Sequence, residues 1–203
     1  SSDVSLPIWN MPTTADVTVT GGTLSNNTYG VYATNYDPQF ASGSSSHALV
    51  SGVTINGATA AGIYVEDNLL NATNATFNLT VQNDCEITGT AHNLTGIWIK
   101  GADASATIKD NDASIHGFAI GIDVDGGSAT ITNNHIYDNG IGVRFTNAGT
   151  GTVNNGNNFE GGVDPDNARD IQATATAGTV LASPNNSFAG DTYGVENLSA
   201  TNI

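Results

Sequence analysis

Short runs of alternating apolar and polar residues recur along this chain, and most of them begin with glycine. The repeated phrase is Gly, an aliphatic residue, a free position and a second apolar residue, and its starts are separated by 21–34 residues. It stands at residues 30–33, 62–65, 96–99, 121–124 and 142–145, with a weaker copy at 170–173 and a last copy at 194–197. Alternation of period two is typical of strands. A repeat of about 20–50 residues indicates a solenoid, whose units bury their apolar faces by stacking.

A second pattern accompanies the phrase, in which a polar turn separates two apolar positions. It is found at residues 50–55, 81–87, 107–115, 130–136 and 152–159. The turns are rich in Asn, Asp and Gly, which tolerate the left-handed backbone of tight corners. No helical period persists, so each unit predicts two or three short strands that pair in parallel with their equivalents one repeat later. We therefore predict an all-β fold, a single-stranded parallel β-helix of about seven coils spaced about 4.8 Å apart.

Stacking of the coils predicts which side chains share a row. Alternate strand residues point to opposite faces, so the aliphatic residue of each phrase should face the interior, and corner Asn residues should stack along the axis. The first outward row then contains Tyr32, Tyr64, Trp98, Asp123, Arg144, Gln172 and Glu196. The second outward row contains Thr34, Glu66, Lys100, Asp125 and Thr146.

The ends and the longer repeats suggest the domain organisation. Residues 1–16 carry Pro7, Trp9 and Pro12 and are expected to form a cap or linker, and residues 17–203 are expected to form the β-helix. Three stretches make their repeats longer than the shortest one and are interpreted as protruding insertions: 35–46, 67–78 and 161–170. The last repeat carries no capping signal, which favours a fragment of a longer surface protein.

Charge and cysteine content restrict the partners. The formal net charge is −15, with four Lys and Arg against 19 Asp and Glu. This balance disfavours nucleic acid and anionic membranes, and it is compatible with Ca²⁺. No apolar run approaches the roughly 20 residues of a membrane span, so no membrane insertion is expected. Cys85 is alone, which excludes an intrachain disulfide, and its apolar surroundings in the sequence predict a core position.

The units at 131–136 and 139–143 resemble the right-handed parallel β-helix repeats of the pectin-lyase-like superfamily, including the NosD-like repeats of microbial surface proteins. The resemblance covers about residues 17–200 and implies a right-handed β-helix. This fold carries lyases, hydrolases, epimerases, adhesins and passive stalks, so it does not by itself imply one activity.

The enzymes of this superfamily have catalytic motifs that this sequence lacks. Polygalacturonase-like enzymes carry Asp-Asp, Gly-His-Gly and Arg-x-Lys, whereas here Ile115 precedes His116-Gly117 and neither Arg144 nor Arg169 begins an Arg-x-Lys. The aromatic-Gly-Phe-Asp-Pro-His motif of alginate-epimerase-like enzymes is also missing. No catalytic residue is transferred by the resemblance.

Three kinds of site remain as candidates. Tyr32, Tyr64 and Trp98 form an aromatic strip that could bind a polysaccharide or cell-surface glycan, or that simply covers the sheet. Asp123, Asp125, Lys100 and Arg144 could form a lyase-like catalytic cluster, or ordinary charge pairs between strands. Asp110, Asp112, Asp164 and Asp166 are Ca²⁺ candidates, or solvated turn acids.

We favour a non-catalytic, extracellular β-helix module of a microbial surface or secreted protein, with no cofactor other than Ca²⁺. The alternative is a polysaccharide lyase or glycoside hydrolase acting on uronic-acid polymers. A third hypothesis, ice binding by regular Thr arrays, is disfavoured because the pairs Thr18/Thr20, Thr130/Thr132 and Thr174/Thr176 are too scattered along the sequence to make one flat face.

Overall fold

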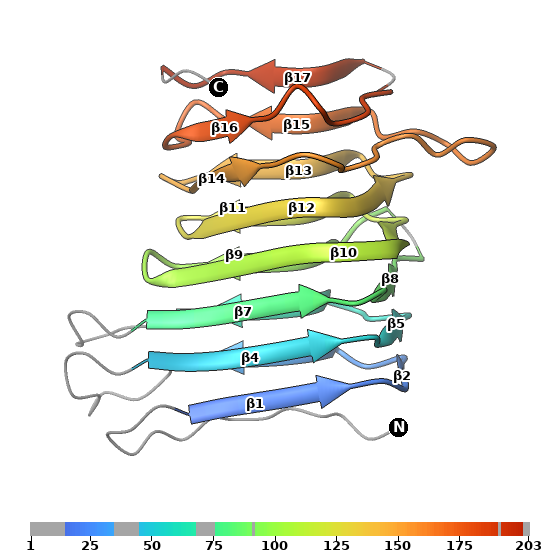
Figure 1. The fold of residues 1–203 in the computed structure, drawn as a ribbon, viewed down its shortest axis with the longest axis vertical. Helices are drawn as coiled ribbons and strands as arrows, with labels where there is room; N and C mark the ends of the chain where they lie inside the picture. The colour runs from blue at the N-terminus through green and yellow to red at the C-terminus, as the bar shows by residue number, and fades with distance from the viewer. Residues whose placement is uncertain (1–14, 35–44, 68–75, 91, 191, 201–203) are drawn as a thin grey trace.

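The chain winds into a parallel β-helix, in which each coil lies on the previous one. The computed structural model describes residues 15–34, 45–67, 76–90, 92–190 and 192–200. Every regular element in these residues is a strand, and every strand ladder is parallel. The coils are stacked along one axis, with β1 (Ala15–Thr20) at one end and β17 (Tyr193–Asn197) at the other (Figure 1). The predicted fold class is confirmed.

The repeated phrases form a seven-stranded sheet along one side of the molecule. Equivalent residues of successive phrases are direct neighbours in it, for example Ile97, Ile122 and Val143. Its strands are β3 (Tyr29–Thr34), β6 (Ala61–Glu66), β9 (Thr95–Lys100), β11 (Ile120–Asp125), β13 (Ile141–Thr146), β15 (Arg169–Ala173) and β17 (Tyr193–Asn197).

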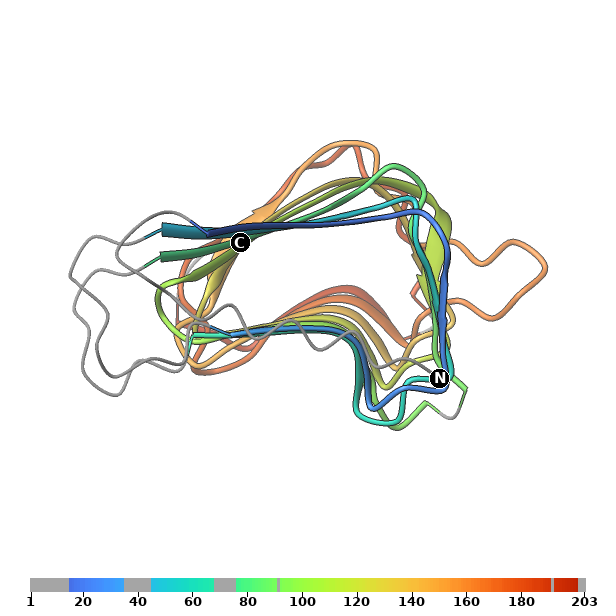
Figure 2. The same cartoon turned by 90° about the horizontal axis from the view of Figure 1, so that it is seen from below.

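A ten-stranded sheet forms the remaining sides of each coil. β10 and β12 run through the corner between two sides, whereas earlier coils use two separate strands there. Viewed along the axis, the coils superpose on a common outline (Figure 2). The strands are β1 (Ala15–Thr20), β2 (Thr23–Ser25), β4 (Ser45–Ser51), β5 (Thr54–Asn56), β7 (Thr76–Gln82), β8 (Glu86–Thr88), β10 (Ala104–His116), β12 (Ser128–Tyr137), β14 (Thr150–Val153) and β16 (Val180–Ala182).

Aliphatic rows fill the interior, and their burial drives the stacking. The predicted row from Val31 to Ile171 is buried throughout, and a matching row in the ten-stranded sheet includes Val50, Val81 and Ile108. Burying one such side chain contributes about 1.5–3 kcal/mol. Cys85 is fully buried among them, as predicted, and burial raises the pKa of its thiol.

In the first five copies of the phrase, the close approach of neighbouring coils requires the initial glycine, whereas Asp170 occupies this place in the sixth copy. A Cβ on Gly62 would lie 2.6 Å from the carbonyl oxygen of Gly96 and 2.6 Å from the Ile87 side chain. No larger residue fits such a space without moving the backbone. The phrase therefore marks the place where the backbones of successive coils lie closest to one another's glycines.

Asparagines stack at one corner, as predicted. Asn111, Asn134, Asn157 and Asn186 are buried, and the side-chain amide of each of the first three donates to the Oδ1 atom of the next, at 2.8–3.0 Å. A left-handed residue precedes each of the first three, namely Asp110, Asn133 and Gly156. Cys85 occupies the preceding place in this row and donates its backbone N–H to Asn111 Oδ1 at 3.1 Å.

A second amide row, from Asn139 to Asn167, was not predicted. Asn139 Nδ2 donates to Asn167 Oδ1 at 3.0 Å, and Asn167 Nδ2 donates to Asp170 Oδ1 at 3.0 Å. Asn139 and Asn167 each stand three residues before a phrase, and that spacing is the sequence signal for this row.

The predicted insertion boundaries need correction. Ser45 and Ser46 belong to β4, and residues 76–78 belong to β7, while residues 35–44 and 68–75 lie outside the described residues, as do 1–14 of the predicted cap. The segment between β14 and β15 projects from the stack, as expected (Figure 2). This segment ends earlier than predicted, because Arg169 and Asp170 belong to β15 and Asp170 is buried. Polar composition alone did not separate outward strand residues from loops.

Candidate functional site

The predicted outward row exists in the register that the phrases imply. Tyr32, Tyr64 and Trp98 are direct cross-strand neighbours on β3, β6 and β9. The row continues through Asp123 and Arg144 to Gln172 and Glu196. Beside it runs the second predicted row, in which Glu66, Lys100 and Asp125 are neighbours on successive strands.

The aromatic side chains stack on one another along the axis. The ring centroids of Tyr32 and Tyr64 are 5.4 Å apart with an interplanar angle of 14°, and those of Tyr64 and Trp98 are 4.8 Å apart at 38°. Tyr29 joins the same stack, with centroids 5.2 Å from Tyr32 and 5.4 Å from Tyr64. We call Tyr29, Tyr32, Tyr64 and Trp98 the aromatic strip.

Tyr29 was not predicted to face outward, because strict alternation from Val31 places residue 29 in the interior. Gly30 and Val31 are both buried in β3, and a Cβ on Gly30 would meet the Ile55 side chain, so the alternation breaks at this glycine and Tyr29 faces outward. The same position in the seventh copy of the phrase is Tyr193, so an aromatic residue just before Gly was the available signal.

Tyr64 is not an exposed platform, which corrects the expectation of three open rings. Only 7% of its surface is exposed, because Tyr32 and Trp98 cover its two ring faces. Burial, followed by the charge of Glu66, raises the pKa of Tyr64 to about 12. Tyr29, Tyr32 and Trp98 are half-buried, so they are the rings that the strip offers to a partner.

Two polar groups lie against the strip. Lys100 Nζ is 2.9 Å from Glu66 Oε1 and 3.4 Å from the Tyr64 hydroxyl, and it lies 5.7 Å from the centroid of the Trp98 ring. The hydrogen bond to Glu66 raises the pKa of Lys100. The Nε1–H group of Trp98 is buried and has no hydrogen-bond acceptor among the described residues.

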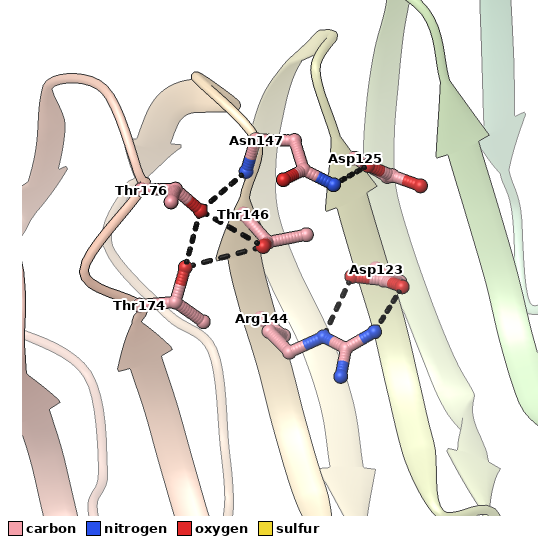
Figure 3. Close-up of polar contacts among 7 residues, drawn as sticks. All are labelled: Asp123, Asp125, Arg144, Thr146, Asn147, Thr174 and Thr176. Carbon is pink, nitrogen blue, oxygen red and sulfur yellow. Dashed lines mark hydrogen bonds and ion pairs between the residues drawn. The ribbon is translucent and has the colours of Figure 1, made fainter.

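A buried ion pair follows the aromatic strip along the row. Arg144 donates from Nε to Asp123 Oδ1 at 3.0 Å and from Nη2 to Asp123 Oδ2 at 2.6 Å (Figure 3). The Asp123 side chain is only 2% exposed. Burial raises the pKa of Asp123, and the two hydrogen bonds from Arg144 oppose that rise. Its location on the outward row was predicted, but its burial was not.

The other candidate charges have partners of their own. Asp125 Oδ1 accepts a hydrogen bond from Asn147 Nδ2 at 2.7 Å, and the Asn147 backbone N–H donates to Thr176 Oγ1 (Figure 3). Thr146, Thr174 and Thr176 are linked through their hydroxyls at 3.2–3.3 Å. Lys100, Asp123, Asp125 and Arg144 therefore lie on neighbouring strands, but they form separate pairs rather than one cluster of carboxylates around a free cation.

The Ca²⁺ candidates lie at two separate places. Asp110 and Asp112 lie at the corner within β10, where Asp110 Oδ1 accepts from Asn133 Nδ2 at 3.2 Å. Asp164 and Asp166 lie in the projecting segment, where Asp166 Oδ1 accepts from the Gly161 backbone N–H at 2.7 Å. Within the described residues, no three His, Cys, Asp or Glu side chains are grouped so that they could hold a metal ion.

The threonine pairs are less scattered than expected. Thr18, Thr80, Thr107, Thr130 and Thr152 share one outward row of the ten-stranded sheet, so two of the three pairs lie on one face. Leu49 interrupts this row and Lys109 flanks it. Thr174 and Thr176 follow β15, beside the seven-stranded sheet.

Comparison with known proteins agrees with this architecture. A family model described as a right handed beta helix region matches residues 40–202. No curated protein and no solved structure matches the chain. In the part of the chain that the structure describes, no helix has the length and apolar character of a membrane span.

Proposed function

Because this chain belongs to the right-handed β-helix family, we propose that it is a non-catalytic module of a microbial surface or secreted protein that contacts glycans through the aromatic strip. The observation that carries the proposal is the strip itself, in which Tyr29, Tyr32, Tyr64 and Trp98 stack over three successive coils. Tyr and Trp combine apolar area with a polar group, which suits the mixed surface of a sugar.

The strip divides its work between support and contact. Tyr64 is held between two rings and fixes their orientation, which lowers the entropy that binding would cost. Tyr29, Tyr32 and Trp98 supply the accessible surface.

The pairing of the acids supports a non-catalytic role. A general base must reach the proton that it removes, whereas the Asp123 carboxylate is 2% exposed and both of its oxygens accept hydrogen bonds from Arg144. Asp125 and Lys100 are engaged with Asn147 and Glu66. The proposal places the module outside the cell, where glycan polymers are found.

Replacing Trp98 tests the glycan contact. We expect Trp98→Ala to weaken retention on a glycan array or in affinity electrophoresis by at least about tenfold, because an aromatic residue at the centre of a binding surface commonly carries that share of the affinity. Tyr137→Ala is the matched control, because Tyr137 is a half-buried aromatic residue of the ten-stranded sheet.

Equal loss in both variants, or full retention by Trp98→Ala, would contradict the proposal. The wild-type chain should also release no reducing ends and no unsaturated products from pectin, alginate or neutral polymers. Turnover of any of these polymers would instead support the polysaccharide lyase or hydrolase.

A further inference from the structure

The chain has few cationic residues, and those on the seven-stranded sheet form ion pairs with carboxylates. The chain has four Lys and Arg residues, of which Lys109 lies on the ten-stranded sheet. The other three lie on the seven-stranded sheet, and each contacts a carboxylate on an adjacent coil. The distances are 2.9 Å for Lys100–Glu66, 2.6 Å for Arg144–Asp123 and 2.8 Å for Arg169–Glu196.

The carboxylates in these pairs are more buried than the cations. Side-chain exposure is 17% for Glu66, 2% for Asp123 and 16% for Glu196, against 42%, 31% and 34% for their partners. A carboxylated sugar that took one of these cations would leave a largely buried carboxylate without its partner, and an uncompensated buried charge is strongly unfavourable. The carboxylates of the ion pairs therefore compete with an acidic ligand for the three cations.

The electrostatic field of the whole molecule also disfavours an acidic ligand. A formal charge of −15 repels a polyanion and slows its association. The groups that remain accessible along the strip are uncharged, because they belong to the half-buried Tyr29, Tyr32 and Trp98 side chains. Such groups suit hydroxyls, which both donate and accept hydrogen bonds.

From this arrangement, and resting on the proposed glycan contact, we infer that the strip takes neutral polysaccharides, whose sugars carry neither carboxylate nor sulfate. Uronic-acid polymers, which the sequence suggested as the substrate of an enzyme alternative, are excluded from the strip by the occupied cations. Specificity is set by ion pairs that face the ligand without binding it.

Affinity electrophoresis of the full chain in gels containing one polymer each tests this inference. The neutral probes are xylan, mannan and a mixed-linkage β-glucan, and the acidic probes are polygalacturonate and alginate. We expect retardation by at least one neutral polymer that Trp98→Ala abolishes, and no retardation by either acidic polymer at low salt. Retardation by an acidic polymer that depends on Trp98 would overturn the inference and leave the glycan contact standing. Retardation by no polymer would overturn the glycan contact itself.

A single substitution tests the mechanism of exclusion. Glu66→Gln releases Lys100 from its ion pair and should produce measurable retardation by polygalacturonate, which the wild type lacks, with neutral binding changed less than twofold. Glu160→Gln is the control, because it makes the same change in net charge at an exposed position of the segment after β14. If both variants increase acidic binding equally, or if neither does, the Lys100–Glu66 pair does not set the specificity.

Discussion

At the residue scale, polar side chains on neighbouring coils satisfy one another, and the Asp123–Arg144 pair is the clearest example. The two residues are 21 positions apart in the sequence and adjacent in the sheet. The repeat alone predicts that Asp123 and Arg144 are neighbours. It does not predict the burial of Asp123, because that burial depends on the side chains of its neighbours on the adjacent coils, Trp98 and Arg144.

Removing one partner of this pair should be costly. Arg144→Gln leaves a buried carboxylate without a cation, and we expect a loss of about 3–5 kcal/mol in the free energy of unfolding at pH 7. The double variant Asp123→Asn/Arg144→Gln should lose much less, because it buries no charge. Urea denaturation followed by Trp fluorescence measures both.

The pH dependence of that loss has a defined sign. Without Arg144, the pKa of Asp123 rises further above its unfolded value of about 3.9, so the folded state binds more protons than the unfolded state. The deficit of Arg144→Gln should therefore be full at neutral pH and shrink as the pH falls toward 4. A deficit that is constant with pH would show that Asp123 is not the group affected.

The asparagine row makes a second prediction at this scale. Asn134→Ala removes the acceptor of Asn111 Nδ2 and the donor to the Ile108 carbonyl, both in the interior. We expect a loss of at least about 2 kcal/mol in the free energy of unfolding. Asn154→Ala, at an exposed position near the same corner, should change stability by less than about 0.5 kcal/mol. Similar effects in the two variants would contradict a structural role for the row.

At the element scale, the sequence predicted strand positions and register well, and exposure and boundaries less well. Period-two alternation and the repeat together assign Ile97, Ile122 and Val143 to one interior row, and the structure confirms it. The same reasoning cannot show that Tyr29 faces outward, because Gly30 and Val31 are buried in succession and break the alternation there. It also cannot separate Thr76 from the preceding polar residues, because outward strand positions and loops share their composition.

A core substitution tests this assignment. Ile122→Asp places an unpaired charge in the interior between Ile97 and Val143, and it should prevent folding or lower the melting temperature by more than 10 °C. Ile122→Val should fold, with a loss of about 0.5–1.5 kcal/mol. Thr132→Asp, which faces outward beside Lys109, should melt like the wild type. A normal melting curve for Ile122→Asp would contradict the register.

At the scale of the whole molecule, residues far apart in the sequence become neighbours because equivalent segments lie one above another. The aromatic strip, the asparagine row and the ion pairs all depend on this arrangement. The stacking can be measured along one outward row of the ten-stranded sheet. This row contains equivalent residues of different coils, namely Thr18, Thr80, Thr107, Thr130 and Thr152.

Spin-label distances along that row test the stacking most directly. In a Cys85→Ala background, a label at Thr18→Cys is paired in turn with one at position 80, 107, 130 or 152, which are two, three, four and five coils away. The mean distance should increase by about 4.8 Å for each coil, whatever the number of intervening residues. Distances that do not increase in this order, or that follow sequence separation instead, would contradict the stacked-coil structure and the aromatic strip together.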